Sequence, residues 1–278
     1  MSASEPRVAT LHSYPLKSGR AHDHEAVEVG PMGFRGDRRF MVVDAAGHFV
    51  TQRGYPRLGL VDLAMVSDGS GATVHVPGVD AIEVPIDRNA GRREVMIWGQ
   101  WVPAEATDPR ADQALSAYLG APVNLVHFPA DGERLPDLPY ADLTDRVAYA
   151  DGFPFLVIGT ASLVALNERL VASGAAPVPM RRFRPNLVVE TDVPFVEDRW
   201  RTIRIAGIPF ALVKRCGRCV IVDVDPVTGR STPGVLEALT TFRKEGKKVL
   251  FGQNAIHRGV GWVRVGDRVE VLDEGLPC

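Results

Sequence analysis

The sequence has 278 residues, of which 45% are hydrophobic and 24% charged, and its formal net charge is -2. A chain of this length can bury a sizeable core, in two domains or in one large all-β unit. The charge shows no basic excess of the kind that nucleic-acid-binding proteins carry, so we expect no nucleic-acid partner.

Three cysteines occur, and two of them, Cys216 and Cys219, are three residues apart. This is not the pattern of a secreted disulfide framework. The first seven residues lack the apolar core of a signal peptide, and no apolar run approaches the ~20 residues that a membrane span needs. We therefore expect a cytoplasmic protein with no membrane partner.

The first strand is predicted at residues 8–14, and it ends in the loop Pro15-Leu16-Lys17-Ser18-Gly19-Arg20. This loop offers two cations, a hydroxyl and a flexible glycine within four residues. Such donors can converge on an anionic group. The same composition is also typical of a solvated turn.

Residues 33–44 are predicted to form a turn and a strand, followed by a hairpin connection at 45–48 and a return strand at 49–52. Alternation along the strand places Arg38 on one face and Arg39 on the other. We expect one arginine to face a solvated cleft and the other a loop or partner strand. A charged sheet edge is the alternative interpretation.

The spacing of the next strands is typical of a sandwich or barrel. They are predicted at 58–66, 72–77, 81–86, 93–98, 101–104 and 123–127. A helix is expected from Asp108, as N-cap, through Tyr118, ending at Gly120. The proline-rich segment 129–143 is the predicted domain junction, which gives domains at 1–130 and 131–278.

The second half alternates strands with two helices. Strands are predicted at 155–158, 187–190, 202–206, 208–214, 248–251, 258–264 and 268–272. Helices are expected at 161–173, with a leucine stripe, and from Pro233, in its first position, to Lys244. The overall prediction is a mainly β protein with some α.

The stretch from Lys214 to Pro226 contains both neighbouring cysteines. We expect them in a tight turn that enters a buried strand at 220–222. Nearby arginine and lysine charges favour the thiolate, which is both a nucleophile and a soft metal ligand.

Four interpretations of the cysteine pair compete. A zinc site needs about four ligands, and no second Cys-x-x-Cys or His pair is present. A thioredoxin-like dithiol places its first cysteine at a helix N-terminus, whereas a strand is predicted here. A buried structural pair and a single thiolate ligand to a cofactor-held metal remain open.

Five segments, in this order, resemble the MOSC (molybdenum cofactor sulfurase C-terminal) family, and most closely its members with an additional N-terminal β-barrel domain, such as the mitochondrial amidoxime-reducing component. They are Tyr14-Pro15-Leu16-Lys17-Ser18, Gly36-Asp37-Arg38-Arg39-Phe40, residues 51–58, Phe183-Arg184-Pro185-Asn186, and Cys216-Gly217-Arg218-Cys219 continuing through 224–229. The resemblance implies an N-terminal β-barrel-like domain and a MOSC β-barrel domain with flanking helices.

The resemblance also implies a bound molybdenum-molybdopterin cofactor, with Cys219 as the metal ligand and the catalytic residue. The positions that match the family's cofactor contacts are Lys17, Ser18, Arg38, Arg184 and Asn186, with Phe153 lining the same cleft. The cofactor would then lie between the two domains.

The implied activity is two-electron reduction of a small N-hydroxylated substrate, such as an amidoxime, a hydroxylamine or an N-hydroxylated base. No cysteine cluster is present for a fused iron–sulfur domain, so we expect a separate electron-donor protein. Gly19 and Gly217 depart from the family pattern and bear on substrate preference. The alternative is a non-catalytic cofactor carrier or sulfur-handling protein, although the pyridoxal-phosphate-binding sulfurase domain found in some members has no counterpart here.

Overall fold

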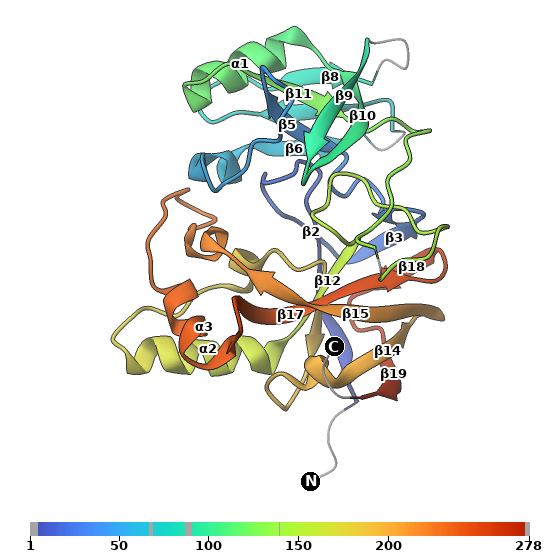
Figure 1. Cartoon of the computed structure of the whole chain (residues 1–278), viewed down its shortest axis with the longest axis vertical. Coiled ribbons are helices and arrows are strands. Elements are labelled where there is room, and N and C mark those ends of the chain that lie inside the picture. Colours follow the sequence, from blue (N-terminus) through green and yellow to red (C-terminus); the bar gives the residue numbers. More distant parts are fainter. Residues whose placement is uncertain (1–4, 67–68, 87–90, 139, 276–278) are drawn as a thin grey trace.

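The computed structural model describes residues 5–66, 69–86, 91–138 and 140–275. Strands dominate this part of the chain, where they form four sheets accompanied by three α-helices. The predicted class, mainly β with some α, is confirmed. Figure 1 shows an upper part built largely from residues 40–127 and a lower part built largely from residues 155–274.

The lower part is organised around one sheet of nine strands, and the first strand of the chain belongs to it. In spatial order the strands are β19 (Val269–Glu274), β14 (Trp200–Ile205), β15 (Ile208–Arg218), β17 (Lys248–His257), β12 (Phe155–Gly159), β13 (Leu187–Glu190), β1 (Arg7–Ser13) and β2 (His22–His24), with β16 (Lys244–Glu245) paired to β17. Because β1 pairs antiparallel with β13, the loop that leaves β1 lies beside the segment that precedes β13.

Helices cover one face of this sheet. Helix α2 (Thr160–Ala172) connects the parallel strands β12 and β13, and α3 (Val235–Arg243) packs beside it. Alternation along β12 sends Leu156 and Ile158 into the core under the helices, and Phe155 and Val157 into the core on the opposite face. The continuous apolar run of β12 is therefore explained by burial on both faces.

The upper part contains two of the three smaller sheets. They are β5 (Phe40–Asp44), β11 (Val123–His127), β10 (Gln100–Ala106) and β9 (Arg92–Ile97) in one, and β6 (Asp62–Met65), β7 (Gly71–His75) and β8 (Ile82–Pro85) in another. The third joins β18 (Gly261–Arg264), β3 (Ala26–Gly30) and β4 (Gly33–Phe34). None of the four sheets closes into a barrel within the described residues, so the expected barrels are open here.

Helix α1 (Pro109–Leu119) has the predicted ends. The Asp108 carboxylate accepts a hydrogen bond from the backbone N–H of Arg110, and Gly120 closes the helix in the left-handed conformation at φ 73°.

Strand β5 shows the predicted alternation, since Phe40 and Met41 enter two different hydrophobic cores.

Two predictions in the upper part are wrong. The return strand at 49–52 is absent, and only an isolated bridge joins Phe49 to Val43. The predicted strand 58–66 begins instead as the 3₁₀ helix η1 (Pro56–Leu60), and only β6 is extended. Pro56 fits the first turn of a helix, because its missing N–H needs no partner there.

The cysteine segment also differs from its prediction. Strand β15 continues to Arg218, so Cys216 lies in a strand rather than in a turn. The apolar run after Cys219 forms the 3₁₀ helix η4 (Val220–Asp223) and not a strand. Short apolar runs have no decisive period, and here η4 packs against α3.

Helix α3 begins later than predicted. Gly234 is its N-cap, which leaves Pro233 outside the helix. Strand β17 extends to His257, and residues 258–260 belong to no strand. Gly234 has no side chain to cap the helix, and the buried Asp223 replaces it, accepting from the backbone N–H of Val235 at 2.9 Å and of Leu236 at 3.1 Å.

This long-range cap predicts a stability loss. Asp223→Ala leaves two N–H groups unsatisfied and should lower the free energy of unfolding by about 2 kcal/mol, measured by urea denaturation. The control Glu237→Ala removes an exposed first-turn carboxylate that caps nothing and should cost under about 1 kcal/mol. Equal losses in the two variants would contradict this role of Asp223.

Candidate functional site

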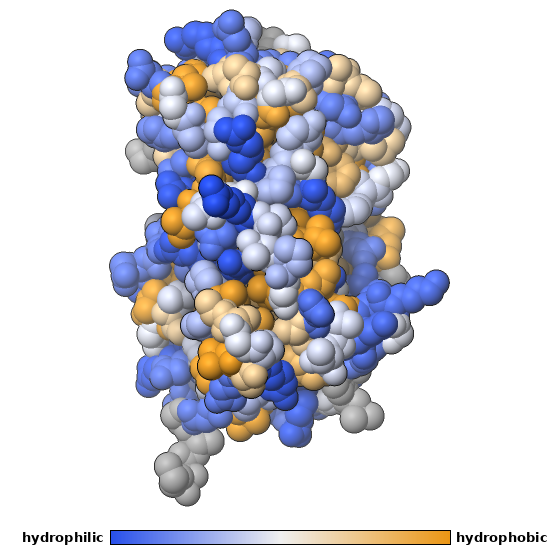
Figure 2. Space-filling model, turned by 90° about the vertical axis from the view of Figure 1, so that its left-hand side faces the viewer, coloured by the Kyte–Doolittle hydropathy of each residue, from blue (hydrophilic) through white to orange (hydrophobic). Residues whose placement is uncertain are grey.

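The structure brings all the predicted site residues to one cavity of about 150 Å³. They are Lys17, Ser18, Arg38, Phe153, Arg184, Asn186 and Cys219. They come from the β1–β2 loop, the turn before β5, the irregular segment before β12, the loop before β13 and the β15–η4 junction. Figure 2 shows strongly hydrophilic residues at mid-height of one face, where the upper and lower parts meet.

The β1–β2 loop is held against the start of β5 by backbone hydrogen bonds. The N–H of Lys17 donates to the carbonyl of Phe40 at 2.8 Å, and the N–H of Arg38 donates to the carbonyl of Tyr14 at 2.8 Å. Two segments that are twenty residues apart in the chain are thereby locked in register. The side chains of Lys17 and Arg38 enter the same cavity for this reason.

Lys17 is a buried cation with two partners. Its Nζ donates to the carbonyl of Tyr149 at 2.8 Å and to Oδ1 of Asp151 at 2.5 Å. Burial lowers the pKa of Lys17 to about 8, against the opposing effect of Asp151. Surrounding protein atoms displace part of the water around Asp151 and favour its neutral form, but Lys17 and the Trp98 indole outweigh this effect and hold the pKa of that carboxyl well below its usual range. The Asp151 side chain is 65% exposed, so water also stabilises its charge.

Asp37 and Asn186 hold Arg38 in place. Nη1 of Arg38 donates to Oδ2 of Asp37 at 2.5 Å and to Oδ1 of Asn186 at 3.0 Å. Oδ1 of Asp37 accepts from the N–H of Tyr14 at 2.7 Å. Burial raises the pKa of Asp37, and the Arg38 guanidinium opposes this shift.

The side-chain amide of Asn186 is fully hydrogen-bonded within the protein. Its Nδ2 donates to the carbonyl of His12 and to Asp37, each at 3.2 Å. Its Oδ1 accepts from Arg38 and from the N–H of Leu156. Two donors and two lone pairs are the full capacity of an asparagine amide. Asn186 therefore lines the cavity but acts through the residues that it orients.

Tyr14 is the platform on which two of the arginines lie. The guanidinium carbons of Arg38 and Arg184 are 4.3 and 4.2 Å from the ring centroid. The fully buried hydroxyl donates to the carbonyl of Pro185 at 3.0 Å, and burial raises the pKa of Tyr14 to about 12. Burial lowers the pKa of Arg184 to about 10, which still leaves it charged at neutral pH.

Three predicted site residues have left-handed backbones, with φ of 64° at Ser18, 47° at Arg38 and 56° at Arg184. Side chains with a Cβ pay about 1–2 kcal/mol for this conformation. Six residues other than glycine have it in the described ranges, so half of them lie in this cavity. Such concentration of backbone strain is a mark of functional sites.

The cysteine pair is free and partly buried, and both thiols line the cavity. The expected activation by neighbouring cations is wrong for Cys216, because burial raises the pKa of this thiol and outweighs the opposing charge of Arg218. Lys214 pairs with Asp137 at 2.5 Å, and Arg215 pairs with Glu245, so these two cations have carboxylate partners.

Arg218 is a site residue that sequence reasoning missed. Its Nε donates to the carbonyl of Phe251 and its Nη1 to the carbonyl of Phe183, at 2.8 and 2.9 Å. The buried Nη2 has no partner, although Arg218 lines the cavity. A buried donor without an acceptor is costly, and a bound polar or anionic group would satisfy it.

The charges that line the cavity also favour an anionic ligand. Six cations line the cavity, against the single carboxylate of Asp151. They are Lys17, Arg38, Arg53, Arg182, Arg184 and Arg218. Among the residues that the structure describes, no group of three or more His, Cys, Asp or Glu side chains could hold a metal ion. The excess of cations and the nearby thiols fit a ligand that carries both anionic groups and a soft atom.

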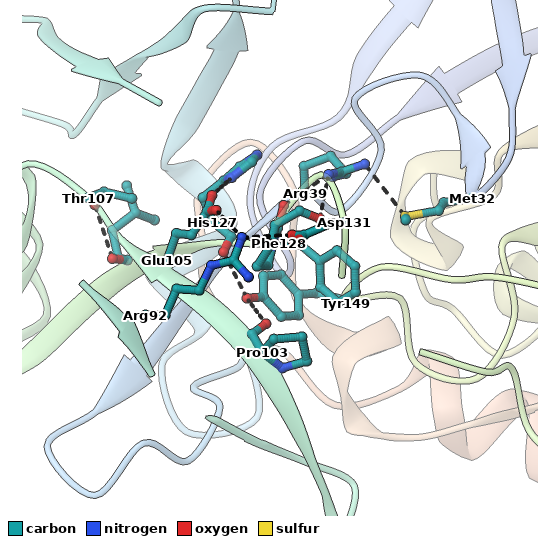
Figure 3. Close-up of polar contacts among 12 residues, drawn as sticks. Met32, Arg39, Arg92, Pro103, Glu105, Thr107, His127, Phe128, Asp131 and Tyr149 are labelled. Carbon is teal, nitrogen blue, oxygen red and sulfur yellow. Dashed lines mark hydrogen bonds and ion pairs between the residues drawn. The ribbon is translucent and has the colours of Figure 1, made fainter. Parts of the chain in front are cut away.

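Tyr149, whose carbonyl accepts from Lys17, belongs to a polar network that Figure 3 shows together with Glu105, His127 and Arg39. The Tyr149 hydroxyl shares its one proton between the carbonyls of Pro103 and His127, at 3.3 and 3.2 Å. Nδ1 of His127 lies 3.0 Å from Oε2 of Glu105. Nη2 of Arg39 donates to the carbonyl of Phe128 at 2.9 Å. Arg38 thus lines the cavity while Arg39 contacts a neighbouring loop, which is the predicted division. Strand alternation is not its cause, because β5 begins only at Phe40 and Arg38 has a left-handed backbone.

The mainly β fold, the cation-lined cavity and the two free thiols beside it are the features that define the class of this protein. The chain matches the MOSC N-terminal beta barrel domain at residues 5–122 and the MOSC domain at 144–270, and it belongs to this MOSC family. The resemblance drawn from the motifs is confirmed. The division at residue 130 stays a prediction and falls between the two matched ranges.

Curated relatives match nearly the whole chain. Mitochondrial amidoxime-reducing component 1 is 32% identical in Homo sapiens, over 96% of this chain and 83% of the relative, and 33% identical in Danio rerio, over 94% and 83%. Mitochondrial amidoxime reducing component 2 of Macaca fascicularis is 31% identical, over 94% and 82%. Across the described ranges, no helix has the length and apolar character to cross a membrane.

The lowered pKa of Lys17 predicts a pH-dependent stability. Between pH 8 and the ordinary value of 10.5, the folded protein releases a proton that the unfolded chain keeps, so stability rises with pH. The free energy of unfolding of the native protein relative to Lys17→Met should rise by up to ~1.4 kcal/mol per pH unit across this window. Urea denaturation at several pH values measures it. The tyrosines titrate in both proteins and cancel, so a constant difference would contradict the burial of a charged Lys17.

Proposed function

We propose that this protein binds a molybdenum pterin cofactor in the cavity and reduces small N-hydroxylated compounds, such as amidoximes, hydroxylamines and N-hydroxylated bases. The observation that carries the proposal is the convergence of six cations, an unsatisfied Arg218 N–H and the Cys219 thiol on one cavity. The names of the curated relatives support the same class of activity.

The residues divide into three roles under this proposal. The Cys219 thiolate is the protein's ligand to the metal, since thiolates suit soft transition metals. Lys17, Ser18, Arg38 and Arg218 supply donors to the anionic and polar parts of the cofactor, with Arg184 beside them. Asn186 acts as a positioning residue for Arg38, and Phe153 forms an apolar wall.

The reaction converts an amidoxime, two electrons and two protons into an amidine and one water. When bound, the cofactor supplies the two-electron chemistry that cleaves the N–O bond. The chain holds the substrate near Cys219, keeps the cations in place for the cofactor and limits the access of water. The electrons come from a separate donor protein in this proposal.

The test uses protein from a cofactor-competent host. Molybdenum-loaded protein should reduce benzamidoxime to benzamidine with reduced methyl viologen as electron source. Protein from a cofactor-deficient host is the control and should be inactive. Loaded protein that turns over neither benzamidoxime nor hydroxylaminopurine would contradict the reductase and favour the second candidate, a cofactor carrier or sulfur-handling protein.

The two cysteines provide a matched pair of variants. Cys219→Ser should lower the molybdenum content at least 10-fold, because it removes the metal's protein ligand, whereas Cys216→Ser should retain most of the metal. Elemental analysis of the purified proteins measures both. Equal retention of molybdenum by the two variants, or loss only in Cys216→Ser, would contradict the assignment of Cys219.

The predicted cytoplasmic location stays a prediction. The curated relatives named above carry the word mitochondrial in their names, which describes those proteins.

A further inference from the structure

A second cavity of about 410 Å³ adjoins the first. The two cavities share six lining residues: Asp151, Gly152, Phe153, Cys216, Gly217 and Asn254. Cys219 lines only the first cavity, so the second lies next to the candidate metal ligand without containing it. A volume of this size suits a small organic molecule.

The passage beside the cysteines is open at Gly217. This residue is exposed, and a Cβ added there would meet no atom within 4 Å. Gly217 lines both cavities, and it has no side chain that could separate them. A substrate in the second cavity could therefore extend its reacting group toward Cys219 past Gly217.

Trp98 lines the second cavity from the opposite part of the molecule. It is at the tip of the β9–β10 hairpin, where Ile97 pairs with Gln100. The two residues between them, Trp98 and Gly99, have φ of 51° and 81°, as a two-residue type I′ turn requires. Asn or Asp normally takes the first of these positions, and a tryptophan there is conformationally unfavourable.

Three contacts nevertheless hold the Trp98 ring in place. Nε1 donates to Oδ1 of Asp151 at 3.1 Å, the Phe49 ring lies 4.9 Å away between centroids, and the Arg53 guanidinium carbon lies 4.8 Å from the indole centroid. The side chain is still 48% exposed. A large aromatic side chain in an unfavourable turn position, fixed but half open to a cavity, is suited to contact a ligand.

We infer that Trp98 is a specificity-determining residue, which stacks on planar aromatic N-hydroxylated substrates in the second cavity and selects them over aliphatic ones. The inference rests on the proposed function for the reaction itself. Trp98 touches the remote part of the substrate rather than the N–O bond, so its contribution is uniform binding, which changes KM more than kcat.

The test compares two substrates in loaded protein, aromatic benzamidoxime and aliphatic acetamidoxime. In Trp98→Ala, the ratio of kcat/KM for benzamidoxime to that for acetamidoxime should fall about 10-fold, mostly through KM, as expected for a lost stacking contact. Trp101→Ala is the matched control, because Trp101 is on the same hairpin, is 53% exposed and lines neither cavity. Its ratio should stay at the native value.

A second readout needs no turnover. Without an electron donor, benzamidoxime should quench the fluorescence of the native protein and of Trp101→Phe, and this quenching should be lost in Trp98→Phe. Molybdenum content and thermal denaturation are measured for each variant, so that a folding defect is recognised. The inference fails, while the proposed function stands, under one combination of results. Both substrates are reduced, Trp98→Ala leaves the ratio of their kcat/KM values unchanged, and benzamidoxime still quenches the fluorescence of Trp98→Phe. If neither substrate is reduced, the proposed function fails, and the quenching alone decides whether Trp98 binds the aromatic ring.

Discussion

The antiparallel pairing of β1 with β13 is the constraint from which the rest of the site follows. Leu11 pairs with Leu187, and the N–H of His12 donates to the carbonyl of Asn186 at 2.9 Å. The first strand of the chain is thereby inserted into the sheet of the second half. The loop that leaves β1 must then pass the segment that enters β13, and cations from both ends of the sequence meet there.

Bringing these cations together has an electrostatic cost that the protein offsets only in part. Asp37 neutralises Arg38 and Asp151 neutralises Lys17, while Arg184 and Arg218 rely on carbonyls and aromatic rings. Burial lowers the pKa of Lys17, and the buried Nη2 of Arg218 has no acceptor, so neither cation is fully compensated by the protein. An anionic ligand would relieve both, which is why the cavity is better explained by binding than by stability.

Sequence patterns predicted the features that depend on local chemistry. Helix α1 has the cap at Asp108 and the stop at Gly120 that its residues favour. Strand β5 alternates between two hydrophobic cores at Phe40 and Met41, as predicted. The gathering of the site residues was predicted from the family resemblance, because the residues between β1 and β13 contain no local signal for that pairing.

Features set by tertiary contacts could not be predicted. The apolar run at 220–222 forms η4, which packs against α3, and Asp223 at the end of η4 caps that helix. Nothing in the residue types of Ser18, Arg38 and Arg184 indicates a left-handed backbone, since none is glycine or asparagine. Arg218 was grouped with the other cations near the cysteines, and only its packing shows that one of its donors lacks an acceptor.

The most direct measurement of the central claim is a crystal structure of the protein purified with its native cofactor. The account predicts a molybdenum atom bonded to Sγ of Cys219, with the anionic part of the cofactor hydrogen-bonded to Lys17, Arg38 and Nη2 of Arg218. A cofactor bound outside this cavity, or a metal that does not contact Cys219, would contradict the account.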